Sequence, residues 1–289
     1  MKLIYISSLA RSGSTFLQML LSSHPNLVGL GEIDRTVRNF CIHRGVDAVD
    51  EVRKKIGEAA PRERRCSCGA LPMECDFWGP VLPKLSQCNP DQGYKFVLEN
   101  FRSAYPDCHL VDSSKTLNAL LKNIVEPQIV DRDDVRVLFL VRDFRGWANS
   151  VKKHNVVRRE ISGKSGLWYG YYQDCYRWWY SNRKIRRTLN RFQVPHLTVS
   201  YEQLVFQTKT QLERIWSFLG VAPPESDCNL ATAKSHDLYG NSDMKNSPVK
   251  RQNIVYDDAW LTDWRPVAGA LLLLPVYHFN RQVHTRLAS

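Results

Sequence analysis

The sequence has no hydrophobic run long enough to cross a membrane. Arg11 interrupts the apolar opening stretch at residues 1–21, and the later run at residues 268–276 is also too short. The chain shows no secretory segment, no internal repeat and no low-complexity linker. We therefore expect a cytoplasmic protein without a transmembrane segment, built as one domain over residues 1–289.

Acidic residues are in the minority. The 29 Asp and Glu residues, against 40 Lys and Arg residues, leave a net charge of +11. Such a charge suits a polyanionic cofactor, an acidic acceptor, an anionic membrane surface or nucleic acid. The chain has no zinc-finger spacing, no helix-turn-helix signature and no extended basic tail, so we expect no nucleic-acid partner.

Apolar strand-like runs alternate with helical stretches along most of the chain. This alternation predicts an α/β fold in which helices flank a central parallel β-sheet. The length suits one large core. The pattern changes at about residues 43–92, which we interpret as a cysteine-containing insertion in the same domain.

A short strand, a turn of small residues and a helix follow one another near the start of the chain. This arrangement aims backbone N–H groups and a helix dipole at one spot, where a phosphate can bind. Against the P-loop pattern G-x-x-x-x-G-K-[ST], Ser8 replaces the first glycine and Ser14 the lysine, which argues against nucleoside triphosphate hydrolysis. A serine-rich turn that merely caps a helix is the alternative. The candidate phosphate-binding residues are Arg11, Ser12, Gly13, Ser14 and Thr15.

A second candidate anion site follows the apolar run at residues 135–141. This run is typical of a buried parallel strand, and open α/β sheets bind ligands at the carboxyl ends of such strands. Arg142 lies at that end, and Ser150 follows about two helical turns later. A guanidinium fork and a hydroxyl suit a second phosphate. The alternative is a surface ion pair between Arg142 and Asp143.

Two further polar groups end predicted strands. Glu32 ends the strand that follows the first helix, with Asp34 as a nearby rival carboxylate. Lys115 follows a buried strand at residues 109–114, whose Asp112 could also be the aspartate of a magnesium-binding Walker B strand.

Taken together, these segments resemble sulfotransferases that use 3'-phosphoadenosine 5'-phosphosulfate (PAPS), and most closely their bacterial, carbohydrate and tyrosylprotein branches. The first loop resembles the family's 5'-phosphosulfate-binding loop, and Arg142 with Ser150 resembles its 3'-phosphate-binding segment. The resemblance implies the P-loop-like sulfotransferase fold and the product 3',5'-ADP. It also implies that Glu32 is the catalytic base and that Lys115 steadies the transferring group.

Two later segments extend the resemblance. Residues 197–204 resemble the family's strand-to-helix Tyr-Glu-x-Leu element, which implies that Tyr201 lies near the nucleotide. Residues 236–250 resemble the loop that closes over the cofactor and supply Asn241 and Lys245 as candidates. The family pattern Gly-Asn-x-x-Arg is here one residue longer and has lysine for arginine, so the closing cation among residues 240–251 stays open.

The predicted reaction is in-line transfer of a sulfuryl group to an acceptor hydroxyl. Glu32 accepts the hydroxyl proton, while Lys115 and Arg11 stabilise charge on the leaving 5'-phosphate. No divalent metal is required, because a sulfuryl group carries less negative charge than a phosphoryl group. The acceptor is a carbohydrate, a glycolipid, another small molecule or a protein tyrosine. A P-loop nucleotide kinase and a non-catalytic nucleotide-binding protein are the alternatives.

The insertion holds three close cysteines, Cys66, Cys68 and Cys75. They could bind zinc with Cys41, His43 or Cys88 as fourth ligand, although the paired C-x-x-C spacing is absent. They could also pair as a disulfide, which a reducing cytoplasm disfavours, or stay free, which is our default expectation. Similar Cys-x-Cys-Gly…Cys-x-Phe-Trp stretches occur in some bacterial sulfotransferases.

An aromatic segment spans residues 168–180. Five of its residues share one helical stripe, which we expect to pack in the core. They are Trp168, Tyr172, Cys175, Tyr176 and Trp179.

Overall fold

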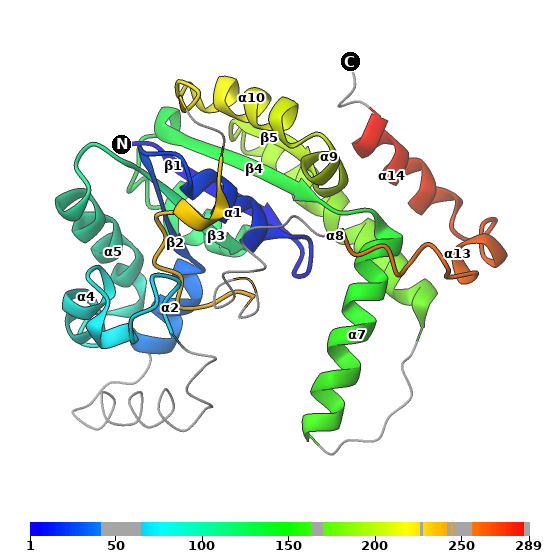
Figure 1. Ribbon diagram of the computed structural model, residues 1–289, viewed down its shortest axis with the longest axis horizontal. Coiled ribbons are helices and arrows are strands. Elements are labelled where there is room, and N and C mark those ends of the chain that lie inside the picture. The colour runs from blue at the N-terminus through cyan, green and yellow to red at the C-terminus, as the bar shows by residue number, and fades with distance from the viewer. Residues whose placement is uncertain (42–64, 163–169, 226–227, 242–243, 245–255, 286–289) are drawn as a thin grey trace.

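Five parallel strands form the centre of the protein. The computed structural model describes residues 1–41, 65–162, 170–225, 228–241, 244 and 256–285. The strands pair in the order β2-β3-β1-β4-β5 (Figure 1). The central strands are apolar and buried on both faces, as a parallel sheet covered by helices requires. The strands are β1 (Leu3–Ser8), β2 (Leu27–Gly31), β3 (His109–Lys115), β4 (Val135–Val141) and β5 (His196–Ser200).

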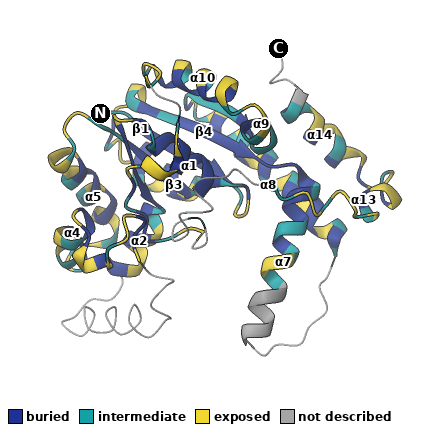
Figure 2. Cartoon of the chain, in the orientation of Figure 1, coloured by how far each residue is buried: buried dark blue, intermediate teal, exposed yellow. Residues whose placement is uncertain are grey.

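Helices cover both faces of this sheet, so the expected α/β architecture is confirmed. One hydrophobic core lies under α1 (Ser14–Ser22), α9 (Tyr201–Phe206) and α10 (Thr208–Leu219). The other core lies on the opposite face of the sheet, where Figure 2 shows the buried residues in dark blue. The helices of that face are α2 (Ile33–Cys41), α4 (Trp78–Leu85), α5 (Pro90–Ala104), α7 (Phe144–Ser162), α8 (Tyr171–Arg191) and α14 (Leu274–Thr285).

Short elements complete the described chain, and none of its helices is long and apolar enough to span a membrane. The short elements are η1 (Pro72–Glu74), α6 (Leu117–Leu120), η2 (Leu121–Val125), η3 (Arg132–Asp134), η4 (Leu230–Thr232) and α13 (Arg265–Ala268).

The strand order reverses direction beside the first strand. From β1 the chain moves toward β3 and β2, whereas β4 and β5 lie on the other side of β1. Ligands of open α/β sheets bind at the carboxyl ends of the strands, where the order reverses. Here that position lies between the ends of β1 and β4, the strands that precede the two predicted anion sites.

The segment at residues 234–237 runs beside β2 like an additional short strand (Figure 1). The Gly29 N–H donates to the Lys234 carbonyl over 3.0 Å, and the His236 N–H donates to the Gly29 carbonyl over 2.7 Å. This pairing brings a late part of the chain to the edge of the sheet. The segment then leads to Gly240 and Asn241, which lie over the first turn of α1.

The predicted core stripe of the aromatic segment is confirmed at Cys175 and wrong at Tyr176. Tyr172 and Trp179 pack against the core but are only partly buried, and Trp168 lies outside the described residues. In α8 the buried face passes through Tyr171, Asp174, Cys175 and Trp178, whereas Tyr176 is exposed. The buried face includes polar residues, Asp174 among them, and an apolar pattern alone does not reveal such a face.

Candidate functional site

The loop between β1 and α1 leaves a helix N-terminus without a side-chain cap. Gly13 is the N-cap residue at φ 93° and makes no capping hydrogen bond. A Cβ at this position would lie 2.4 Å from the Tyr201 ring, so glycine is required both by the backbone and by the close approach. Backbone N–H groups at such an uncapped end are available to an anion.

The loop is held from the other side by helix α7. The Trp147 indole donates to the Ala10 carbonyl over 2.8 Å. Arg11 has a left-handed backbone at φ 72°, and its guanidinium contacts the His154 ring of α7. The loop between β1 and α1 therefore contacts α7 near the carboxyl ends of β1 and β4.

Arg142 follows β4 and reaches the same loop. Its Nη1 donates to the Arg11 carbonyl over 3.3 Å, and its guanidinium lies 5.0 Å from the centre of the Tyr201 ring. The side chain is buried, and its Nε has no hydrogen-bond partner among the described residues. An unpartnered buried guanidinium nitrogen is costly, and a bound anion would satisfy it.

The alternative ion pair between Arg142 and Asp143 is wrong. The Arg142 Nη2 instead lies 3.5 Å from Asp257 Oδ2, and Asp257 also pairs with Lys153 at 2.9 Å. The Asp143 carboxylate accepts two hydrogen bonds from the Arg145 guanidinium, of 2.9 and 2.8 Å. Burial raises the pKa of Asp143, but the bonds from Arg145 outweigh it and lower the pKa overall.

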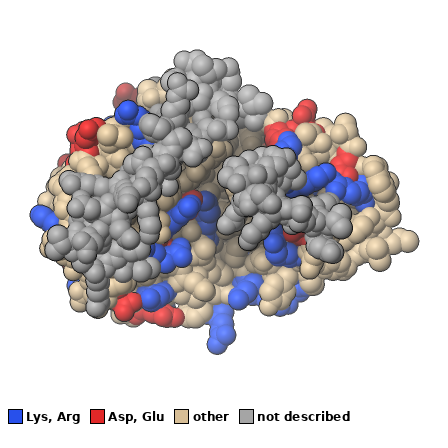
Figure 3. Space-filling view, turned by 90° about the horizontal axis from the view of Figure 1, so that it is seen from below, with Lys and Arg blue, Asp and Glu red and all other residues tan. Residues whose placement is uncertain are grey.

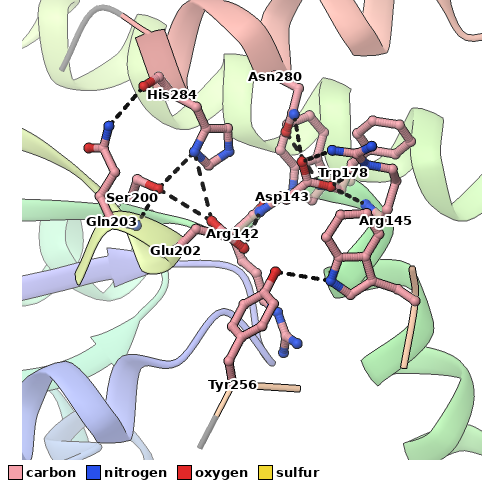
Figure 4. Close-up of polar contacts among 12 residues, drawn as sticks. Arg142, Asp143, Arg145, Trp178, Ser200, Glu202, Gln203, Tyr256, Asn280 and His284 are labelled. Atoms are coloured by element: carbon pink, nitrogen blue, oxygen red, sulfur yellow. Dashed lines mark hydrogen bonds and ion pairs between the residues drawn. The ribbon is translucent and has the colours of Figure 1, made fainter. Parts of the chain in front are cut away.

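A buried polar network supports the backbone around Arg142 (Figure 4). The Trp178 indole donates to the Arg142 carbonyl over 3.0 Å. The Asn280 amide donates to Asp143 Oδ2 over 2.8 Å, and the Asp143 N–H donates to Glu202 Oε1 over 3.0 Å. Sequence reasoning missed these partners, since they lie on helices far from Arg142 along the chain.

Glu202 and His284 meet at the end of β5. The Ser200 hydroxyl lies 2.7 Å from His284 Nδ1 and donates to Glu202 Oε2 over 3.3 Å. Burial raises the pKa of Glu202 to about 7 and lowers the pKa of His284. Both side chains are therefore mostly buried, next to Asp143, which follows Arg142.

Glu32 and Lys115 meet across the ends of β2 and β3. Lys115 Nζ lies 2.5 Å from Glu32 Oε1, and both side chains are mostly buried. Arg35, on the first turn of α2, adds a weaker contact at 3.5 Å. Lys115 has a left-handed backbone at φ 70°, and its carbonyl accepts a hydrogen bond from the Ser7 hydroxyl.

The rival carboxylates are held by other partners. Asp34 pairs with Arg38 at 2.7 Å and accepts a hydrogen bond of 2.9 Å from Asn123. Asp112 is fully buried, where Tyr94 and Ser114 donate to it, and burial raises its pKa to about 7. Glu32, rather than Asp34 or Asp112, is therefore the carboxylate that pairs with Lys115.

The remaining predicted residues lie around this centre or outside the described chain. The Asn241 N–H donates to Thr15 Oγ1 over 3.3 Å, which places the late segment against the first turn of α1, beside the predicted phosphate-binding loop. Ser150 lies two turns along α7 from Arg142 and is half-buried. Lys245 lies outside the described residues. Several Lys and Arg side chains gather near the middle of the face that Figure 3 shows.

The three close cysteines of the insertion meet a residue that sequence reasoning did not consider. The structure brings His236 to Cys66, Cys68 and Cys75. Cys41 and Cys88 are directed to the carbonyls of Leu85 and Lys84, and His43 lies outside the described residues. The fourth group is 161 residues from Cys75 along the chain, so no local spacing could indicate it.

One family model matches most of this chain, and solved structures share its fold. The family model described as the sulfotransferase domain matches residues 2–256. The chain is similar to the sulfotransferase domain of the Synechococcus PCC 7002 olefin synthase, with 19% identity, a TM-score of 0.56 and coverage of 97% of this chain and 93% of that one. It is also similar to a sulfotransferase domain from the curacin biosynthetic pathway, with 16% identity, a TM-score of 0.51 and coverage of 94% and 97%. The search of curated protein sequences gives no match.

Proposed function

The chain belongs to the sulfotransferase domain family, and on that basis we propose that it transfers a sulfuryl group from PAPS to an acceptor hydroxyl. The observation that supports the proposal is that the two predicted anion sites lie next to each other. The amino end of α1, which has no side-chain cap, lies next to the buried guanidinium of Arg142. The Arg142 Nη1 donates to the carbonyl of Arg11 in the loop that precedes α1. A nucleotide with 5'- and 3'-phosphates suits this pair of sites.

In this proposal the chain binds the donor through its two phosphate groups. The first N–H groups of α1, with Ser12, Ser14 and Thr15, hold the 5'-phosphosulfate end. Arg142, whose Nε lacks a protein partner, holds the 3'-phosphate together with Ser150. Tyr201 fills the space between Gly13 and Arg142, and so sets the distance between the sites.

In the proposed reaction, Glu32 acts as the base and Lys115 stabilises the negative charge on the leaving group. The Glu32 carboxylate takes the proton of the acceptor hydroxyl as its oxygen forms a bond to sulfur. The bond from sulfur to the 5'-phosphate oxygen breaks, and 3',5'-ADP leaves with the bonding electrons. Lys115 and Arg11 stabilise the charge that collects on that oxygen. The ion pair between Glu32 and Lys115 keeps both groups at one place before the acceptor binds.

The acceptor is proposed only as a class. We propose a hydroxyl of a carbohydrate, a glycolipid, another small molecule or a protein tyrosine. We also propose a cytoplasmic location, since a reducing compartment keeps thiols unpaired, and all eight cysteines are unpaired in the structure.

Calorimetric titration tests the proposed donor. We expect 3',5'-ADP to bind at least about tenfold more tightly than ATP with Mg²⁺, a difference of about 1.4 kcal/mol or more. Tighter binding of ATP with Mg²⁺ would overturn the proposal and favour a kinase. Transfer of radiolabelled sulfate from PAPS to a panel of acceptors tests the reaction itself. Tight 3',5'-ADP binding without transfer to any acceptor of the panel would favour a non-catalytic nucleotide-binding protein.

A further inference from the structure

Three cysteines and one histidine gather away from the phosphate loop. Cys66 and Cys68 lie on one turn, Cys75 precedes α4, and His236 lies on the segment beside β2. Their sulfur and ring-nitrogen atoms all lie within 4.8 Å of one another. Cys66 and Cys75 are buried, whereas Cys68 is exposed.

The spacing of these atoms matches the edges of a tetrahedron around one metal ion. Cys75 Sγ lies 3.6 Å from Cys66 Sγ, 3.8 Å from Cys68 Sγ and 3.2 Å from His236 Nδ1. Around a zinc ion with Zn–S bonds of about 2.3 Å, sulfur ligands lie about 3.8 Å apart. A disulfide needs about 2.05 Å between its sulfur atoms, so these thiols are too far apart to be bonded to each other.

The surrounding groups fit metal ligation by the histidine and by Cys75. The Tyr105 hydroxyl lies 2.8 Å from His236 Nε2, which leaves Nδ1 facing the sulfur atoms. Ligating histidines generally have such a partner on the second nitrogen. The Trp78 N–H donates to Cys75 Sγ over 3.5 Å. Exposure of Cys68 leaves a route by which an ion can enter from solvent.

We propose that Cys66, Cys68, Cys75 and His236 bind one Zn²⁺ ion in a closed structural site. Three thiolates and one imidazole are ligands that zinc prefers, and four protein ligands leave no position for a substrate. On binding, the three thiols release three protons and each sulfur atom donates an electron pair to the metal. This inference does not rest on the proposed function.

The site joins the insertion to the late segment that reaches the phosphate loop. The Ser67 N–H donates to the Asp237 carbonyl over 3.1 Å, and the Ser67 and Ser235 hydroxyls lie 2.7 Å apart. The Trp78 indole donates to the His236 carbonyl. Bound zinc therefore fixes the turn of Cys66 against residues 235–237, four residues before the contact of Asn241 with Thr15.

The test measures metal binding by the full chain, purified with a reductant. We expect about one zinc per chain by elemental analysis, and a thiolate-to-metal charge-transfer band when Co²⁺ replaces zinc. Cys68→Ser changes an exposed ligand, and it should weaken Zn²⁺ affinity at least about a hundredfold, measured by competition with a chelator. Cys88→Ser removes a thiol outside the cluster and should bind Zn²⁺ as the unchanged chain does.

His236→Ala provides a second variant, in which all three thiols are kept. It should weaken Zn²⁺ affinity and change the Co²⁺ spectrum, because one nitrogen ligand is lost. The proposal is overturned if the unchanged chain takes up no Zn²⁺, or if Cys68→Ser and Cys88→Ser bind it equally tightly. A Co²⁺ complex without the thiolate band would overturn it as well.

Discussion

Replacing Arg142 by alanine removes the guanidinium that we assign to the 3'-phosphate. The side chain is buried at the carboxyl end of β4, and its Nε has no partner among the described residues. Two charge-assisted hydrogen bonds to a phosphate contribute about 1.5–3 kcal/mol each. Their loss should therefore weaken 3',5'-ADP binding by roughly a hundredfold or more, measured by calorimetry.

A nucleotide without a 3'-phosphate tests whether Arg142 binds that phosphate rather than the 5'-phosphate. Adenosine 5'-monophosphate lacks the 3'-phosphate, so Arg142→Ala should change its affinity by less than about threefold. Arg142→Lys keeps the charge without the fork and should fall between the alanine variant and the unchanged chain. Arg136→Ala, at the amino end of the same strand, is the matched control. Equal losses for both nucleotides, or none for either, would refute the placement of the 3'-phosphate.

The remaining predictions concern the base, the loop and the buried carboxyl group. Glu32→Gln should lower the rate of sulfate transfer from labelled PAPS at least about a hundredfold without changing 3',5'-ADP affinity, whereas Asp34→Asn should keep most of the rate. A high rate in Glu32→Gln would place the base elsewhere. Gly13→Ala should lower the free energy of unfolding by about 2 kcal/mol or more in urea titration, because of its φ of 93° and the Tyr201 ring. Gly220→Ala, at φ 60° with only the tip of a lysine nearby, should cost less, and equal costs would refute the role of the ring. The pKa of Glu202 is about 7 in the folded chain against an ordinary 4.5, so folding stability should fall as pH rises through this window, by up to about 3 kcal/mol. Glu202→Gln should flatten that slope in denaturation curves at about pH 5 and pH 8, and an unchanged slope would assign the effect to another group.

The strands and helices that carry the proposed phosphate-binding residues could be predicted because their signals are local. A strand, a small-residue turn and a helix lie within about twenty residues, and the apolar run of β4 ends directly before Arg142. Parallel strands then bring both carboxyl ends to one edge of the sheet. The contact between Arg142 and the Arg11 carbonyl follows from this topology.

The partners that support the site could not be predicted in the same way. Asn280 and His284 reach the end of β4 and β5 from α14, and His236 reaches the cysteines from a segment beside β2. Such contacts depend on how distant elements pack, which hydrophobic periodicity does not encode. The buried face of α8 differs in part from the predicted stripe for a related reason. This face includes the polar Asp174, which an apolar pattern does not indicate.

The structure of the chain with 3',5'-ADP bound would test most directly whether one nucleotide occupies both anion sites. We predict the 5'-phosphate within about 3 Å of the first N–H groups of α1 and the 3'-phosphate within about 3 Å of the Arg142 guanidinium. A nucleotide that contacts only one of these groups, or that binds elsewhere on the chain, would contradict the account.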